Sequence, residues 1–139
     1  MHLEPWHMEL IERSRVARLA TVSPAGTPAL VPVCFALFEG RFAIPIDDKP
    51  KSGRPLARLR NLAAEPRCAL LFDHYDDDWS QLAWLRVDGW ARVIDGGMAP
   101  EMLAALRSRY SQYREMDLEH RSVIVMTPAR CVSWRWQMD

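Results

Sequence analysis

The feature that most constrains the fold is a series of short β-rich runs separated by tight-turn residues. Residues 16–23, 28–38 and 41–46 are rich in apolar and β-branched side chains. Proline and glycine occur within residues 24–28, and glycine again within residues 39–40, between these runs. Such punctuation is typical of hairpin turns. We therefore expect these three runs to pair as an antiparallel meander.

The rest of the chain continues this pattern, with helices between the strands. Further strands are predicted over residues 67–75 and 82–94, and two more within residues 122–138, split at Pro128 and Ala129. Helices are predicted over residues 5–14, 55–63 and 99–115, and Met102, Leu103 and Leu106 of the last are expected to form a buried apolar stripe. Many short antiparallel strands commonly close into a barrel, which removes their edges. The prediction is one domain over residues 1–139, mainly β, an antiparallel barrel with peripheral helices.

The order of the predicted elements and the composition argue against a dinucleotide-binding fold and against nucleic-acid or membrane partners. A doubly wound dinucleotide fold needs alternating strands and helices with a glycine-rich first turn, and the chain has neither. The 139 residues, 49% of them hydrophobic, suffice for a core without disulfides or a structural metal. Lys plus Arg and Asp plus Glu number 18 each, so no overall field favours nucleic acid or an acidic membrane. Any basic site must be local.

The cysteines and the N-terminus bear on location. Cys34, Cys68 and Cys131 are odd in number, widely spaced and form no C-x-x-C pair. This pattern argues for a reducing compartment and against a disulfide framework or a cysteine zinc site. No apolar run resembles a signal peptide or a membrane span. We expect a cytoplasmic protein.

No motif for catalysis by the protein's own side chains is found. The histidines show no metal-ligand spacing, no G-x-S-x-G occurs, and Cys34 lies in an apolar run where a packing role is the default. The acidic stretch 73–78 lacks the alternating ligands and glycine of a calcium loop, so it is interpreted as a solvated turn. We predict no metal site and identify no catalytic residue. If the protein is an enzyme, a bound cofactor carries the reaction.

A cluster of cations precedes the second predicted helix. Lys49, Lys51 and Arg54 come just before a helix opened by a proline. A helix N-terminus carries partial positive charge, so cations beside it are unfavourable unless an anion offsets them. The segment therefore predicts an anion site. The alternative is a solvated basic loop whose charges are held by the aspartates at 47–48.

Three segments together resemble a known superfamily. They are residues 15–37, "RVARLATVSPAGTPALVPVCFAL", residues 42–79, which include "DDKPKSGRPLARLRNL", and residues 84–94, "WLRVDGWARVI". The order is similar to that of the pyridoxamine 5'-phosphate oxidase-like superfamily, over about residues 8 to 136. Its members are split β-barrel proteins that bind FMN or the deazaflavin coenzyme F420 at a dimer interface. The chain most resembles the branch of probable deazaflavin-dependent oxidoreductases.

This resemblance implies roles for the basic segment. Lys49, Lys51 and Ser52 stand where family members grip the cofactor phosphate, and Arg54 or Arg58 could add a bidentate contact. A phosphorylated tail would relieve the crowding of cations. The deazaflavin tail carries a phosphodiester and several carboxylates, so the surplus of arginines favours it over FMN.

The resemblance also assigns a surface to the cofactor ring. Family members lay the ring across two strand ends, which here comprise Val31, Pro32, Val33 and Cys34, and Ile44, Pro45, Ile46 and Asp47. A planar ring needs an apolar shelf, with backbone groups at its polar edge. The alternative is that Pro32 and Pro45 merely mark sheet edges or bulges.

A third segment resembles the part that family dimers bring from the partner chain. Its residues are Trp79, Gln81, Trp84 and Arg86, and the last two share a strand face by their spacing of two. Core packing or dimer contact is the alternative for the tryptophans. Trp134 and Trp136, which also share a face, are assigned to the barrel core or the dimer seam.

Together these features predict a homodimeric oxidoreductase that uses coenzyme F420 to transfer a hydride to or from a small organic substrate. An FMN-dependent oxidase or reductase on the same barrel is the nearest alternative. A non-catalytic cofactor carrier or sensor also remains open. Heme binding, known among relatives of this barrel, would need an axial ligand, for which His74 is the candidate.

Overall fold

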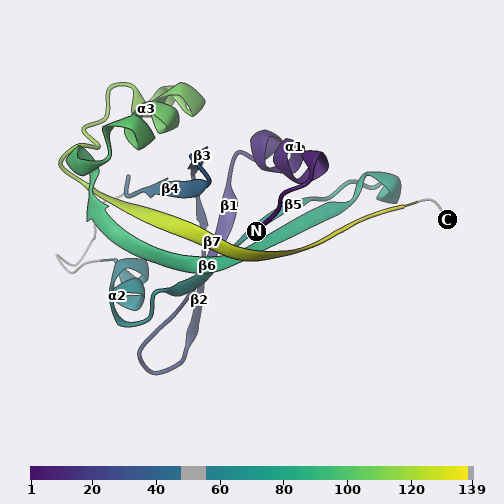
Figure 1. Ribbon diagram of the computed structural model, residues 1–139, viewed down its shortest axis with the longest axis horizontal. Helices are drawn as coiled ribbons and strands as arrows, with labels where there is room; N and C mark the ends of the chain where they lie inside the picture. The colour runs from purple at the N-terminus through teal and green to yellow at the C-terminus, as the bar shows by residue number, and fades with distance from the viewer. Residues whose placement is uncertain (48–55, 138–139) are drawn as a thin grey trace.

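The computed structural model describes residues 1–47 and 56–137 (Figure 1). The helices are α1 (Pro5–Arg13), α2 (Ala57–Ala64) and α3 (Pro100–Arg109), with short 3-10 turns η1 (Trp79–Gln81), η2 (Gly96–Met98) and η3 (Ser111–Tyr113). The strands are β1 (Ala17–Val22), β2 (Pro28–Val33), β3 (Ala36–Phe38), β4 (Arg41–Pro45), β5 (Arg67–His74), β6 (Ala83–Asp95) and β7 (Ser122–Arg135).

The seven strands form one antiparallel sheet in the order β2-β1-β5-β6-β7-β4-β3. The long strands β6 and β7 cross the molecule side by side, with α1 and α3 on one side of them and α2 on the other (Figure 1). The prediction of a mainly antiparallel β-protein with peripheral helices is confirmed.

The sheet curls until strands distant in this order share a core. Phe72 of β5 and Phe42 of β4 are three places apart in the sheet, yet their ring centroids are 5.5 Å apart. Phe35, in the link between β2 and β3, lies 5.1 Å from Phe72. These three fully buried rings close the interior.

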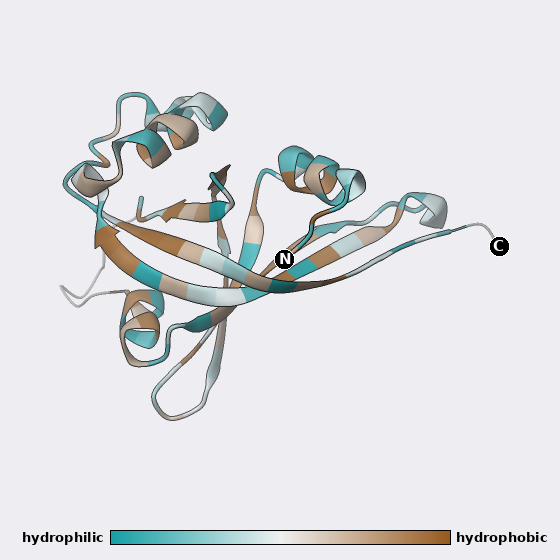
Figure 2. Ribbon diagram, viewed as in Figure 1, coloured by the Kyte–Doolittle hydropathy of each residue, from teal (hydrophilic) through white to brown (hydrophobic). Residues whose placement is uncertain are grey.

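A second core lies under α3. Met102, Leu103 and Leu106 of this helix are buried in a cluster with Ala43 and Val125 of the sheet, so the predicted apolar stripe is confirmed. Figure 2 shows hydrophobic residues gathered along β4 and the adjoining parts of β6 and β7. Because β4 is buried on both faces, its sequence is a continuous apolar run and does not alternate.

The predicted meander is wrong within its middle run, whereas both of its turns join antiparallel pairs, β1 with β2 and β3 with β4. The run 28–38 divides at Cys34 and Phe35 into β2 and β3, which lie at opposite ends of the strand order. The backbone N–H of Phe35 donates to the hydroxyl of Tyr110 at 3.1 Å. The buried Phe35 ring and this long-range bond hold the chain as it crosses from one sheet edge to the other.

The predicted break in the last strand is also wrong. β7 is continuous through Pro128, and the register with β6 shifts so that Ala129 is an extra residue opposite the Asp88–Gly89 step. A bulge tolerates the missing N–H of proline, and β6 continues the pairing on both sides. Because the extra residue lies in β7, the side chains of β6 continue to alternate between the two faces of the sheet as far as Trp90.

The last predicted helix is shorter than residues 99–115. α3 ends at Arg109, and Tyr110 has an extended backbone, with φ −126° and ψ 113°. This conformation turns the Tyr110 ring into the second core, where it is buried. Burial of an aromatic side chain outweighs continued helix propensity there.

Candidate functional site

The two strand ends assigned to the cofactor ring lie around one cluster together with α2. Val33 of β2, Ile44 of β4 and Ile46 are buried in the same hydrophobic cluster as Leu62 of α2. Val31 packs against this cluster, as do Leu56 and Leu59 at the start of α2. Segments far apart in the sequence therefore meet here.

The side chains of this region differ in their availability to a ligand. Ile44 is fully buried, and Val33, Pro45 and Ile46 are also buried, so these four can present only backbone groups. Pro32 is exposed, while Val31, Cys34 and Asp47 are half-buried. Pro32 lies on the edge strand β2 and Pro45 ends β4, so an edge role accounts for both prolines. The role of all eight residues in cofactor binding stays a prediction.

The start of α2 is cationic. Its N-cap residue is Leu56, which makes no side-chain cap hydrogen bond, and no acidic residue lies in the first turn of the helix. Arg58, half-buried, and Arg60, exposed, fall within its first four residues. The predicted phosphate ligands Lys49, Lys51, Ser52 and Arg54 lie outside the described residues.

α2 is anchored to the sheet by a buried polar contact. Asn61 Nδ2 donates to Thr21 Oγ1 at 3.0 Å, and both side chains are buried. A paired buried amide avoids the desolvation penalty and fixes the helix relative to β1. The start of α2 is thus held beside the strand pair β1 and β2.

Asp47 is held by two residues that the sequence did not indicate. Tyr113 Oη donates to Asp47 Oδ2 at 2.5 Å, and Arg121 Nη1 donates to the Asp47 backbone oxygen at 2.8 Å. Burial, with added effects of Asp47 and Cys34, raises the pKa of Tyr113 above its usual value. The contacts join residues 66 and 74 positions apart, and no local motif signals them.

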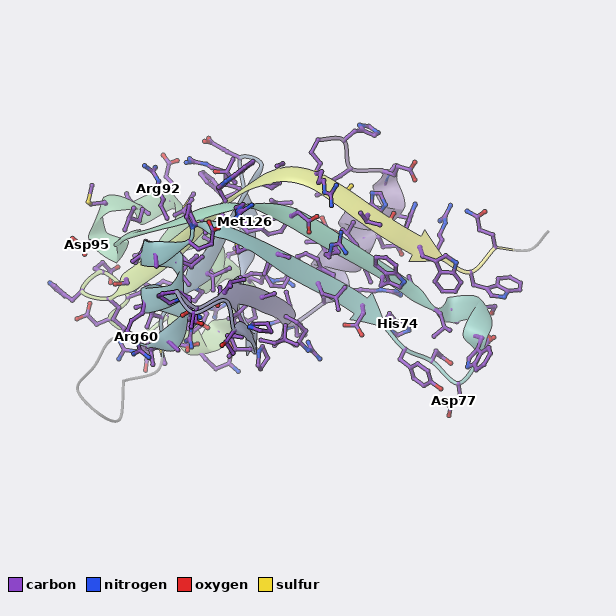
Figure 3. The ribbon with its side chains drawn as sticks, turned by 90° about the horizontal axis from the view of Figure 1, so that it is seen from below. Arg60, His74, Asp77, Arg92, Asp95 and Met126 are labelled. Carbon is purple, nitrogen blue, oxygen red and sulfur yellow. The ribbon has the colours of Figure 1, made fainter. Side chains whose placement is uncertain are left out.

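The residues assigned to the partner chain lie elsewhere. Trp79, 65% exposed, and Gln81 form η1 at the tip between β5 and β6. In Figure 3, His74 and Asp77 of this tip lie at the opposite end of the molecule from Arg60 of α2. Within one chain, this tip therefore lies far from α2.

The tip contributes to a groove of about 520 Å³ between α1 and the ends of β6 and β7. Its walls include Gln81, Trp6 and Trp136, and the Arg135 guanidinium carbon lies 5.0 Å from the Trp6 ring centroid. Trp136 and Trp134 are 40% and 44% exposed. Their assignment to the barrel core is therefore wrong, whereas the dimer seam stays a prediction.

The outer face of β6 carries an ion-pair network among exposed aromatic groups. Asp88 accepts from Arg86 Nε at 2.8 Å and from Arg130 Nε at 2.9 Å. Partial burial acts to raise the pKa of Asp88, but these hydrogen bonds outweigh it, and the pKa lies below its usual value. Trp84 and Trp90, the latter 53% exposed, share this face with Arg86.

The acidic turn behaves as a solvated connection. Asp78 accepts from Ser80 N at 3.1 Å and so caps η1, and Asp77 and Asp78 are exposed. His74 Nε2 lies 3.9 Å from Asp76 Oδ2. Within residues 1–47 and 56–137, no cluster of side chains suited to a metal ion is present. In the same part of the chain, no helix has the length and apolar character needed to span a bilayer.

Comparisons with known proteins agree with this architecture. The sequence model of the family described as pyridoxamine 5'-phosphate oxidase matches residues 3–135. No protein of curated function matches the chain. Among solved structures, the conserved hypothetical protein Rv2991 from Mycobacterium tuberculosis is 20% identical, with a TM-score of 0.76 over 97% of this chain and 86% of that one.

Two further solved structures belong to proteins whose names state a function. An F420 reductase is 24% identical, with a TM-score of 0.69 over 94% of this chain and 98% of that one. HutZ, a heme storage protein from Vibrio cholerae, is 17% identical, with a TM-score of 0.71 over 97% of this chain and 95% of that one. At these identities the neighbours establish the fold alone. The predicted split β-barrel is thereby confirmed, and the chain belongs to the pyridoxamine 5'-phosphate oxidase family.

Proposed function

We propose that the protein is an oxidoreductase that binds a deazaflavin coenzyme, F420, at a homodimer interface and transfers a hydride to or from a small organic substrate. Membership of the family supports a flavin-type cofactor. The structural neighbour named as an F420 reductase supports the deazaflavin over FMN. FMN on the same site is the alternative cofactor.

The observation that carries this proposal is the match of the family model to residues 3–135, and the cationic start of α2 supports it. Arg58 and Arg60 lie near the N-terminus of α2, where the helix dipole favours negative charge. An acidic cofactor tail there would accept charge-assisted hydrogen bonds. The predicted grip of Lys49 and Lys51 precedes the same helix in the sequence.

The remaining residues fit the needs of a flat ring. The bound coenzyme supplies hydride transfer, and the chain supplies binding and orientation. Pro32 is exposed and Val31 and Cys34 are half-buried at the end of β2, which gives the ring a partly apolar shelf. Ile44 of β4 and Ile46, just after β4, lie in the buried cluster against which Val31 packs. An oxidoreductase of this kind needs no strong acid or base of its own.

A second copy of the chain completes the proposed site. The outer face of β6 and β7 carries the exposed side chains of Trp90 and Trp134. Exposed apolar faces of this kind mark interaction surfaces. Such a copy would bring Trp79 and Gln81 toward the cofactor, which one chain leaves apart.

Paired titrations with F420 and FMN, followed by fluorescence, test this function. Wild type is expected to bind F420 more tightly, and Arg58→Gln to weaken binding about tenfold through loss of a charged hydrogen bond. Arg13→Gln, an exposed arginine on α1, is the matched control and leaves the Kd unchanged. Sedimentation measures the dimer. Binding of neither cofactor would refute the proposal, whereas preference for FMN would select the alternative.

Steady-state turnover with a panel of electron acceptors separates an enzyme from a non-catalytic cofactor carrier or sensor. An enzyme shows saturable dependence on one acceptor, and a carrier binds the cofactor without it. Because HutZ shares the fold, hemin titration of wild type and His74→Ala is the parallel test. We expect no Soret shift that depends on His74, which is tied to a solvated turn.

A further inference from the structure

We propose that Tyr113 is a positioning residue for the cofactor ring and acts through Asp47. This inference rests on the proposed function, because the ring is assigned to the strand ends that include Asp47. Neither the resemblance nor any sequence motif gives Tyr113 a role.

The Tyr113 hydroxyl fixes the chain just after β4. It donates to Asp47 Oδ2 at 2.5 Å, and Asp47 closely follows β4. Cys34, which directly follows β2, packs against the hydrophobic cluster that contains Tyr113. The second core therefore lies next to both strand ends that are assigned to the cofactor ring.

Tyr113 is itself rigidly held. It is 3% exposed, its ring centroid lies 5.3 Å from that of Tyr110, and its backbone oxygen accepts from Arg107 Nε at 3.0 Å. Arg121 fixes the Asp47 backbone from a second direction, at 2.8 Å. Supporting contacts of this kind determine how accurately a site residue is placed.

Comparison with Tyr110 separates this arrangement from ordinary packing. Tyr110 is also buried, but its hydroxyl donates to the Arg15 backbone oxygen at 2.9 Å and accepts from Phe35 N and from Arg109 Nε, both at 3.1 Å. The acceptor of its proton is thus a neutral backbone group and not a carboxylate. Tyr113 instead orients a half-buried carboxylate, whose desolvation is costly. That choice of partner points to a carboxylate whose orientation matters to the site.

The test measures the Kd of F420 and of FMN, with Tm in parallel, for wild type, Tyr113→Phe, Asp47→Asn and the double variant. Tyr110→Phe is the matched control, since it removes the other buried hydroxyl. We expect Tyr113→Phe to weaken cofactor binding about tenfold. We expect the Kd of the double variant to be no higher than that of whichever single variant binds the cofactor less tightly, because the two residues act as one unit. Tyr110→Phe is expected to lower Tm while its Kd stays within about twofold of wild type.

The outcomes distinguish this inference from the proposed function. A wild-type Kd for Tyr113→Phe, or losses that multiply in the double variant, would overturn the positioning role alone. An equal loss of affinity in Tyr110→Phe would also overturn it, because general loosening of the second core would then explain the effect. If wild type binds neither cofactor, the proposed function fails and the inference fails with it.

Discussion

Gly89 of β6 leaves no room for a side chain against the neighbouring strand β7. A Cβ at this position would lie 2.1 Å from the Thr127 backbone oxygen and 2.9 Å from Met126 Cε. Ordinary contact with a Cβ begins near 3.4 Å, so Gly89→Ala forces the two strands apart by more than an ångström beside the bulge. The Met126 side chain can rotate away, but the Thr127 carbonyl belongs to the backbone of β7.

The expected cost follows from overpacking. Added atoms in a packed interior cost about 1–3 kcal/mol, with larger values where backbone must move. Replacing glycine lowers the entropy of the unfolded chain and returns about 0.4–1 kcal/mol. The net loss is therefore about 2 kcal/mol, which lowers the Tm of a chain of this length by roughly 6–10 °C.

Thermal unfolding by circular dichroism, with urea unfolding in parallel, measures this effect. Gly97→Ala is the matched control, because a Cβ there would meet its nearest neighbour, the Glu119 backbone oxygen, at 3.4 Å. We expect the control to stay within about 2 °C of wild type. The same small shift for Gly89→Ala would show that the bulge yields easily, and the reasoning from close contact would be refuted.

Three further predictions concern other contacts. Burial lowers the pKa of His7, whose Nδ1 accepts from the Glu4 backbone N–H at 3.0 Å. Below pH 6.5 the unfolded chain therefore binds more protons than the folded protein, so the free energy of unfolding should fall as the pH drops. Urea titrations should show that His7→Gln weakens this pH dependence. Arg107→Lys should lower the midpoint of urea unfolding, because Arg107 contacts both carboxylate oxygens of Glu119, at 2.6 and 2.9 Å, and a lysine cannot make both contacts. An unchanged midpoint would contradict this. Burial, with Asp88 nearby, raises the pKa of the Cys68 thiol to about 12. A thiol reagent at pH 8 should therefore leave Cys68 unmodified until guanidinium unfolds the protein. Mass spectrometry of the labelled peptides measures this.

The strands and helices were largely predictable because their signals are local. The runs 41–46, 67–75 and 82–94 correspond to β4, β5 and β6 within one or two residues. Turn residues and alternation act over a few positions, so they specify elements wherever the chain lies in space. The same local argument identified the solvated acidic turn and the buried stripe of α3.

The errors arose where distant segments decide the outcome. Whether residues 28–38 form one strand or divide between the two edges of the sheet depends on where Phe35 is buried and on its bond to Tyr110. Whether Pro128 ends a strand depends on β6, which lies beside it and absorbs one extra residue. Tyr110 leaves the helix because the core beneath α3 accepts its ring.

For the site, the sequence by itself determined the ingredients: the basic segment before α2, the strand ends around Val31 and Ile44, and the family resemblance. Only the tertiary structure decided that Ile44 is fully buried in the core, that the tip with Trp79 lies far from α2, and that Tyr113 donates a hydrogen bond to Asp47. The physical reason is that residue type and spacing act locally, whereas burial and hydrogen-bond partners depend on segments that only folding brings together.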